Sequence, residues 1–279
     1  MKEENTLKKT LIYLIIITST IYIAWRILFT VPIHLGIWTL IFSICLLTIE
    51  IWDYIEFIIY YKNILSKSNP KSNKKVLVKK YPDVDVIIAT INEKEELLQK
   101  TIQGCLNMEY PDKNKVHIYI CDDGNRKEIK ELAQNNNINY ITRKNNKDAK
   151  AGNYNNALKY LKSEYIATFD ADMVPDKYFL VNSMPFFCME EKVGFVQTPQ
   201  AFYNFDIFQN RFHLGNEIPF DQSFFYNELQ PAKARINATV YCGTNAILSR
   251  KALDEIGGFA TGTLTEDIAT RNANRRSRI

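Results

Sequence analysis

The stretch Tyr165-Ile-Ala-Thr-Phe-Asp170-Ala-Asp172 joins an apolar run to two carboxylates. The apolar run predicts a buried β-strand, and the two acids come where that strand ends. Residues two apart on an extended backbone point to the same side, so both carboxylates would face one ligand. A Mg²⁺ or Mn²⁺ ion held by only one or two carboxylates keeps positions that substrate phosphates fill. Asp-x-Asp is also common by chance, and solvated acids at a strand end are the alternative.

The composition limits the kinds of protein that this chain can be. Its 279 residues are 46% hydrophobic and 24% charged, which suits a membrane anchor followed by one domain of ordinary size. A net charge of only +4 gives no reason to expect a nucleic-acid partner. The five cysteines form no Cys-x-x-Cys pair, so we expect scattered reduced thiols rather than a metal site.

Two uncharged apolar stretches predict transmembrane helices at about residues 9–29 and 33–55, joined by a tight turn at Val31-Pro32-Ile33. A cleavable signal peptide is the alternative for the first, disfavoured because a second apolar stretch follows at once. Lysines flank the pair on both sides, so the positive-inside rule places the rest of the chain in the cytoplasm, with the turn outside. Arg26 and Glu50 are expected at different depths and therefore unpaired. Glu50 is interpreted either as an interface residue or as part of a polar path.

Residues 1–62 are thus predicted to be a membrane region, 63–80 a basic linker and 81–279 a cytoplasmic domain. In that domain, short β-branched runs alternate with amphipathic segments of helix length. This alternation predicts an α/β fold, with a mostly parallel sheet covered by helices on both faces and ligands at the carboxyl ends of the strands. The expected strands are 84–90, 116–121, 138–141, 165–169, 193–198 and 239–248, and the expected helices are 93–106, 126–134, 149–161, 202–229 and 250–256.

Three polar residues, Thr90, Asn92 and Glu93, follow the first expected strand. They stand at the ligand-binding edge of the predicted sheet, where a nucleobase or ribose would be held. The alternative is local: Asn92 caps the next helix and Glu93 favours its positive N-terminal end. The two interpretations are compatible.

Two further motifs lie at the same predicted edge. In Asp122-Asp123-Gly124, one acid would accept a hydrogen bond from a uracil N–H or a ribose hydroxyl while the other supports the loop, and the glycine would permit a tight turn. A simple Asp-Gly turn is the alternative. Lys150, followed by Ala-Gly152, opens an expected helix, where its ammonium adds to the attraction of the helix N-terminus for a diphosphate. A solvated surface lysine is the alternative.

The last motif is Thr265-Glu266-Asp267. A carboxylate placed near the anomeric carbon of a sugar would accept the proton of an attacking hydroxyl, giving direct displacement with inversion. By itself, the motif is also a good helix start.

Taken together and in order, these motifs resemble those of the cellulose-synthase-like branch of the family 2 processive glycosyltransferases. The likeness covers almost the whole chain, including Trp25-Arg26 and Thr30-Val-Pro32. The motifs are Val84-Asp85-Val-Ile-Ile-Ala-Thr90-Ile-Asn92-Glu93, Asp122-Asp123-Gly124, Lys150-Ala-Gly-Asn153, Asp170-Ala-Asp172, Val196-Gln-Thr-Pro199 with Phe202-Tyr-Asn204, Tyr241-Cys-Gly-Thr-Asn245 and Thr265-Glu266-Asp267.

The resemblance implies a GT-A domain at the plasma membrane that transfers sugar from a UDP-sugar, by resemblance UDP-glucose, to a β-linked polysaccharide with Mg²⁺ or Mn²⁺. Other subunits of a synthase complex are implied as partners. By carry-over, Thr90, Glu93, Asp122 and Asp123 would hold the uridine, Lys150 the diphosphate, Asp170 the nucleotide and metal, and Asp172 the metal; Asp267 would be the general base with Glu266 beside it, and Phe202, Tyr203, Cys242, Gly243 and Thr244 would line the acceptor end.

The sequence departs from that family after Asp267. Members continue with a Gln-x-x-Arg-Trp segment that clamps the acceptor and with further membrane helices, whereas this chain has twelve more residues, rich in arginine and without apolar periodicity. An interrupted gene or an incomplete sequence is therefore expected. Two alternatives stay open: a non-catalytic UDP-sugar-binding subunit, and a non-processive transferase to a lipid or short acceptor, UDP-GlcNAc donors included.

Overall fold

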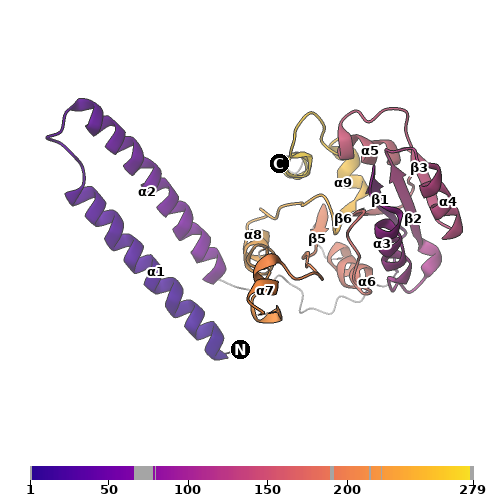
Figure 1. Ribbon diagram of the computed structural model, residues 1–279, viewed down its shortest axis with the longest axis horizontal. Coiled ribbons are helices and arrows are strands. Elements are labelled where there is room, and N and C mark those ends of the chain that lie inside the picture. Colours follow the sequence, from indigo (N-terminus) through magenta and orange to yellow (C-terminus); the bar gives the residue numbers. More distant parts are fainter. Residues whose placement is uncertain are drawn as a thin grey trace. The chain divides into compact units, whose positions relative to one another are not determined.

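A computed structural model describes residues 2–65, 78, 80–188, 192–213, 215–220 and 222–276 of the chain (Figure 1). Most of the predicted linker, including Lys67, Lys71, Lys74, Lys75 and Lys79, lies outside the described residues. The chain divides into two compact units. One comprises Met1–Pro70 with Glu228–Ala238, and the other comprises Lys71–Asn227 with Thr239–Ile279. Each is described by itself.

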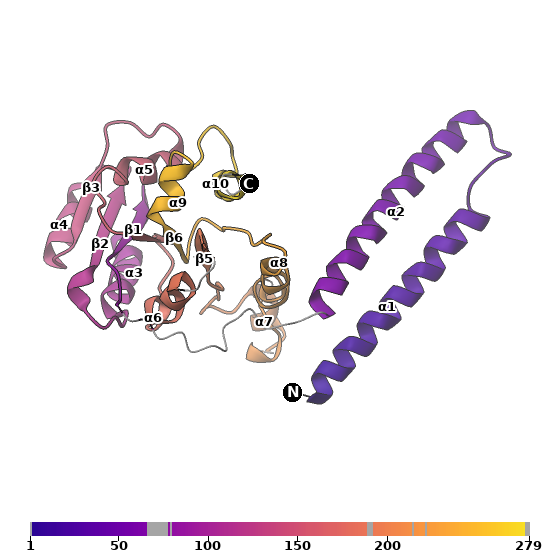
Figure 2. The same ribbon diagram turned by 180° about the vertical axis from the view of Figure 1, so that it is seen from behind.

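The first unit is built on a helical hairpin of α1 (Lys2–Phe29) and α2 (Ile37–Leu65), which lie side by side in Figure 1 and Figure 2. Short α8 (Gln230–Ala234) joins them through buried Ala232, which packs with Ile12 and Ile64. Among the described helices, one segment, Thr6–Phe29, is long and apolar enough to cross a membrane. Membrane crossing by α2 stays a prediction.

The register of this hairpin differs from the expected one. The connection runs from Thr30 to Gly36 rather than through a three-residue turn, and Arg26 Nε donates to Glu50 Oε2 at 2.8 Å. The prediction that these two residues do not pair is therefore wrong. It assumed that the facing helix ends lie level, but the longer connection carries the chain past the end of α1 before α2 begins. Glu50, well inside α2, consequently lies beside Arg26.

The second unit contains a six-stranded sheet in the order β3-β2-β1-β4-β6-β5 (Figure 1). The first four strands are parallel, whereas β6 runs antiparallel to both of its neighbours. The predicted mixed, mostly parallel α/β fold is confirmed. The strands are β1 (Val84–Thr90), β2 (Val116–Asp122), β3 (Asn139–Thr142), β4 (Tyr165–Asp170), β5 (Phe195–Gln197) and β6 (Ala246–Ser249).

Helices cover both faces of this sheet because the apolar residues of the central strand alternate between two cores. On β1, Val86 and Ile88 pack with Leu98 of α3, whereas Ile87 packs on the other face with Tyr154 of α5. Burial on both faces explains the continuous apolar run in β1. The main helices of this unit are α3 (Glu95–Asn107), α4 (Lys127–Asn135), α5 (Ala149–Ala157), α6 (Phe179–Ser183), α9 (Arg250–Glu255) and α10 (Glu266–Arg276).

Two expected elements are broken up in the structure. The predicted helix over 202–229 is divided into separate helices, α7 (Ile207–Arg211) and a π-helical segment at Phe225–Leu229 that leads into α8. It is interrupted because His213 and Gly215 adopt φ of 53° and 46°, outside the right-handed helical region. The predicted strand over 239–248 shortens to β6, because Gly243 and Asn245 adopt φ of 76° and 52°, which an extended strand excludes. The residues before β6 therefore form a loop.

Asp85 provides a test of how this sheet is anchored. Its side chain is 1% exposed, and its carboxylate accepts hydrogen bonds from the N–H of Lys162, the N–H of Ser163 and the Ser163 hydroxyl. We expect Asp85→Ala to lower the free energy of unfolding by about 3 kcal/mol, because charged hydrogen bonds to buried groups are lost. The thermal midpoint, followed by circular dichroism in detergent, would fall by roughly 6–12 °C. Exposed Asp83→Ala is the control, and equal midpoints for the two variants would contradict this role.

Candidate active site

The parallel strands bring the predicted site residues to one edge of the sheet. In the pairing register, Thr90 lies opposite Asp122, and Ala89 lies opposite Asp170. Because β6 runs the other way, the loop before it reaches the same edge, where Thr244 Oγ1 accepts the Asp170 N–H at 3.0 Å. Donor-side and acceptor-side residues predicted from distant motifs therefore meet here.

Asp122 forms the corner between β1 and β2. It is fully buried, and its carboxylate accepts hydrogen bonds from the Gly124 N–H, the Tyr140 hydroxyl and both the N–H and the guanidinium of Arg126. Arg126 also donates to Thr90 Oγ1 at 2.7 Å and so ties the two strand ends together. Of the two adjacent acids, Asp122 is thus the one that supports the loop. Arg126 was missed in the sequence, where only its spacing of four from an acid signalled it.

Gly124 is needed here for close packing. A Cβ at this position would lie 2.2 Å from the Ile91 carbonyl oxygen, far inside van der Waals contact. The backbone turns at residues 123–124, as predicted, and the positive φ that follows, 50°, falls on Asn125. The glycine lets the ends of β1 and β2 approach each other.

Glu93 organises the turn after β1. Its Oε2 accepts the Thr90 hydroxyl at 2.7 Å, the Ile91 N–H at 2.8 Å and the Asn92 N–H at 3.2 Å. Burial disfavours the Glu93 carboxylate, but these hydrogen bonds outweigh it, and the pKa of Glu93 is lowered. The helix begins only at Glu95, with no side-chain cap, so the alternative in which Asn92 caps it is wrong. The Asn92 residue is exposed beside this turn.

Asp123, the second acid, is held by Arg143. The guanidinium donates to both carboxylate oxygens of Asp123 at 2.6 Å. Arg143 also donates to the carbonyls of Lys147 and Ala149, which orders the loop leading into α5. A Cβ on Gly152 would lie 2.1 Å from the Lys147 carbonyl oxygen, so this glycine allows that loop to approach the start of α5 closely. Sequence reasoning did not single out Arg143.

Lys150 lies in the first turn of α5 and forms an ion pair with Asp170. Its ammonium also lies 5.6 Å from the centre of the Tyr154 ring. Burial raises the pKa of Asp170; the Lys150 ammonium opposes this rise and the Asp172 carboxylate adds to it. Lys150, Asp170 and Asp172 are thus electrostatically coupled.

The backbone turns between the two acids of the Asp-x-Asp motif. β4 ends at Asp170, and the Met173 N–H donates back to the Asp170 carbonyl at 3.1 Å. The same-side argument for an extended strand is therefore wrong for Asp172, which is exposed on the turn. Buried Thr101 of α3 fixes this turn by donating to the Ala171 carbonyl at 2.7 Å.

The carboxylates of Asp170 and Asp172 suit a hard divalent cation whose other ligands do not come from the protein. The described residues contain no group of three or more His, Cys, Asp or Glu able to hold a metal. Asp170 and Asp172 offer oxygen donors on one short turn. Mg²⁺ and Mn²⁺ accept such sites when substrate phosphates supply further oxygens. The residues present therefore fit the ion.

Asp267 reaches the site from the start of α10. A Cβ built on Gly243 would lie 3.3 Å from Lys150 Nζ and 3.8 Å from Asp267 Oδ2, so both side chains flank this glycine. Glu266 precedes Asp267 in the same helical turn. A helix forms here although the tail lacks apolar periodicity, and its acidic first turn suits a helix N-terminus.

The two aromatic residues expected at the acceptor end stand apart from this cluster. Phe202 and Tyr203 are 57% and 68% exposed, and Phe202 packs edge-to-face on Phe220. Within the described ranges, no hydrogen bond or ring contact joins them to the strand-end residues.

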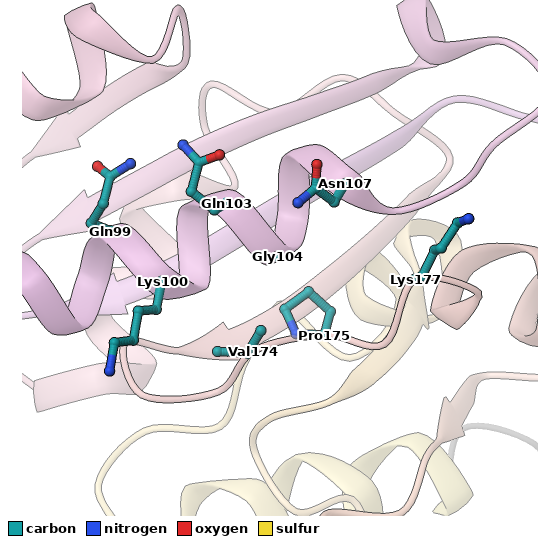
Figure 3. A pocket seen from close by; sticks show the side chains of 8 residues that line it. All are labelled: Gln99, Lys100, Gln103, Gly104, Asn107, Val174, Pro175 and Lys177. Carbon is teal, nitrogen blue, oxygen red and sulfur yellow. The ribbon is translucent and has the colours of Figure 1, made fainter. Parts of the chain in front are cut away.

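A hollow of about 460 Å³ lies elsewhere, between α3 and the segment after Asp172 (Figure 3). Its floor is Gly104 of α3 against Val174 and Pro175, where a Cβ on the glycine would come within 2.7 Å of Val174. Figure 3 shows Gln99 and Gln103 pointing away from this floor. The polar groups do not converge, and none of the predicted site residues lines the hollow.

The chain matches one known protein family and several of its curated members. The model of Glycosyl transferase family 2 matches residues 85–257. Cellulose synthase 1 catalytic subunit [UDP-forming] of Komagataeibacter xylinus is 34% identical over 94% of the chain, but the match covers 36% of that relative. The corresponding Pseudomonas fluorescens (strain SBW25) subunit is 35% identical over 93% of the chain and 35% of its own length. The chain thus spans about a third of the length of these curated relatives.

Solved structures share the fold at lower identity. The mannosyltransferase PcManGT from Pyrobaculum calidifontis, in complex with GDP-Man and Mn²⁺, has a TM-score of 0.59 at 20% identity, covering 76% of this chain and 57% of its own. S. aureus TarS 1-349 in complex with UDP-GlcNAc has a TM-score of 0.51 at 18% identity, covering 70% and 54%. The predicted GT-A-like fold is confirmed. The chain therefore belongs to glycosyl transferase family 2 and, within it, is similar to cellulose synthase catalytic subunits.

Proposed function

We propose that the chain is a membrane-bound, inverting glycosyltransferase that moves a sugar from a UDP-sugar to a hydroxyl of a growing β-linked polysaccharide. The observation that carries this proposal is that Lys150 and Asp267 flank Gly243 at the strand-end edge, with Lys150 paired to Asp170. The curated relatives are named as UDP-forming cellulose synthases, which favours UDP-glucose as the donor. The polysaccharide is proposed on the same ground.

The donor nucleotide would bind across the ends of β1, β2 and β4. Asp123, fixed by Arg143, and exposed Asn92 would face the uridine, beside the turn that Thr90 and Glu93 order. Asp122 would not contact the nucleotide but would hold these residues in position, because its own carboxylate oxygens are buried and hydrogen-bonded. The diphosphate would lie at the start of α5, where the Lys150 ammonium and the helix N-terminus both attract anions.

Asp170 and Asp172 would hold Mg²⁺ or Mn²⁺ together with the diphosphate. When bound, the ion would supply positive charge for the leaving diphosphate. PcManGT, with Mn²⁺ in its structure, supports dependence on a divalent metal in this fold.

Asp267 would take the proton of the acceptor hydroxyl as its oxygen attacks the anomeric carbon. The new C–O bond forms opposite the bond to UDP, which breaks with its electron pair going to the diphosphate, so the configuration inverts. Lys150 would stabilise the negative charge that develops on the leaving group. Glu266 would stay beside the base, and Cys242, Gly243 and Thr244 would form the acceptor side, with Phe202 and Tyr203 further out.

The N-terminal unit supports a place at the membrane. Thr6–Phe29 is able to span a bilayer. We propose that α2 crosses the bilayer in the opposite direction. The catalytic unit would then lie in the cytoplasm, where nucleotide sugars are made. We propose the plasma membrane as the location. Other subunits of a synthase complex remain proposed partners, because the chain spans only about a third of its relatives.

Release of UDP from a panel of UDP-sugars, by membranes that carry the chain, tests this function. We expect Mn²⁺- or Mg²⁺-dependent release, with Asp267→Asn slower by at least about 100-fold because the general base is lost. Asp172→Asn should abolish release, because it weakens the metal-dependent binding of the donor. Exposed Asp83→Asn, at the opposite end of β1, is the matched control and should retain full rate.

The outcomes separate the proposed function from its alternatives. Equal rates for Asp267→Asn and the control would contradict the assigned base. Binding of UDP without turnover of any UDP-sugar would identify a donor-binding subunit instead. Products one sugar longer than the acceptor would identify a non-processive transferase.

Arg143 tests the uridine site separately from catalysis. We expect Arg143→Met to weaken UDP binding in the presence of Mn²⁺ by roughly tenfold, because Asp123 loses a bidentate partner and its fixed orientation. Neighbouring exposed Lys144→Met removes the same charge without touching Asp123 and should bind within about twofold of the unaltered protein. Isothermal titration measures both affinities, and an equal loss in the two variants would show that only net charge matters.

A further inference from the structure

The side chain of Gln197 holds the loop that carries Gly243 and Thr244. Gln197 is the last residue of β5, and its Nε2 donates to the carbonyls of Thr244 at 2.9 Å, Thr198 at 3.1 Å and Asn245 at 3.3 Å. Its Oε1 accepts the Cys242 N–H at 2.9 Å. Carbonyls on one side and an N–H on the other fix which way the amide points.

This contact begins where the strand ladder stops. The ladder of β5 with β6 ends at Gln197 and Ala246. Beyond it, the Thr198 N–H and the Thr198 hydroxyl both donate to the Asn245 carbonyl, at 3.0 and 2.8 Å. Gly243 and Asn245 also adopt positive φ, which takes the loop out of an extended conformation. Thr198 thus holds the Asn245 carbonyl, and the Gln197 amide holds the Cys242 N–H and the Thr244 carbonyl, where the ladder no longer runs.

The loop of residues 242–245 contacts residues of the proposed active site on two sides. Thr244 Oγ1 accepts the N–H of Asp170, and Gly243 lies between Lys150 and Asp267. The loop is buried at Gly243 and Thr244, so a shift of the backbone there would move it against charged side chains. In contrast, Asp123 and Arg143 make their contacts with each other and with the loop before α5.

We propose that Gln197 is a positioning residue for transfer. Its amide fixes the position of the loop of residues 241–245 at the strand-end edge. That position determines how closely an acceptor hydroxyl can approach Asp267. The proposal rests on the proposed transferase function. A misplacement of about 1 Å in such a site costs about 100-fold in rate. Donor affinity would fall less than the rate, because Asp123 and Arg143 follow other strands, although Lys150 and Asp170 contact this loop. Glutamine alone among side chains of this length both donates and accepts; glutamate lacks the donor, methionine lacks both, and asparagine is one methylene shorter.

The test compares Gln197→Glu with Gln197→Met by UDP release over pH 6–8 and by titration with UDP and Mn²⁺. At pH 8, a glutamate oxygen would face three carbonyls without a proton, so we expect release to fall at least about tenfold, and by a larger factor than UDP affinity. The carbonyls disfavour the ionised form and raise the pKa of the introduced carboxyl above its ordinary value of about 4.3. The protonated fraction, which can donate to the Thr244 carbonyl, therefore grows toward pH 6, and the rate of Gln197→Glu relative to the unaltered protein should rise. Gln197→Met should stay low at every pH.

The pH comparison is made as a ratio because other groups also titrate. Asp170, Lys150 and Asp267 face this loop, and Tyr226 lies beside Cys242. All are present in both proteins, so their titration cancels in the ratio. Gln103→Glu, the same change at an exposed position on α3, is the control and should match the unaltered protein throughout.

The results separate this inference from the proposed function. No UDP release by the unaltered protein would contradict the transferase function itself. Normal release by both Gln197 variants, or a pH-independent loss in Gln197→Glu, would overturn the positioning role while leaving the transferase intact. Hydrogen exchange gives a check without turnover: amides 242–245 should exchange faster in Gln197→Met than in Gln103→Glu, and equal exchange would show that the amide does not hold the loop.

Discussion

The ion pair of buried Asp122 with Arg126 is the constraint on which the strand-end edge depends. A carboxylate with no exposure is tolerated only if its charge is paired and its oxygens are hydrogen-bonded. Arg126 meets that need, and the same guanidinium reaches Thr90 and the Glu93 carbonyl on β1. The positions of the β1 turn and the β2 turn are thereby linked, and Gly124 provides the clearance between them.

The candidate site has two halves with different origins. The proposed donor half comes from the parallel strands, whose ends align by register and whose acids are oriented by Arg126, Arg143 and Lys150. The proposed acceptor half comes from the antiparallel β6 and the irregular loop before it, beyond the end of the strand ladder. Thr198 and the Gln197 side chain hold this loop. The two halves are thus held by different interactions, as expected if one edge of the sheet binds two substrates.

The sequence was sufficient for the features that local chemistry dictates. Val84–Thr90 is apolar at five of its seven positions and is a strand buried on both faces. Acids at strand ends meet because parallel strands end together. Sequence reasoning missed Arg126, Arg143 and Gln197. Their long side chains bind residues on other elements, and the neighbouring sequence gives no pattern from which such contacts can be predicted. The register of α1 and α2 was missed for a similar reason, because it depends on the path of a seven-residue connection.

The central claim is that the strand-end edge binds a UDP donor through a divalent cation at the Asp-x-Asp turn. The most direct measurement is an anomalous difference map from crystals of the full chain grown with UDP and Mn²⁺. We expect one Mn²⁺ peak in contact with Asp172 and with the diphosphate, the diphosphate beside Lys150 and the uracil beside Asp123. A Mn²⁺ peak away from both acids of the turn, or UDP bound outside this edge, would contradict the account.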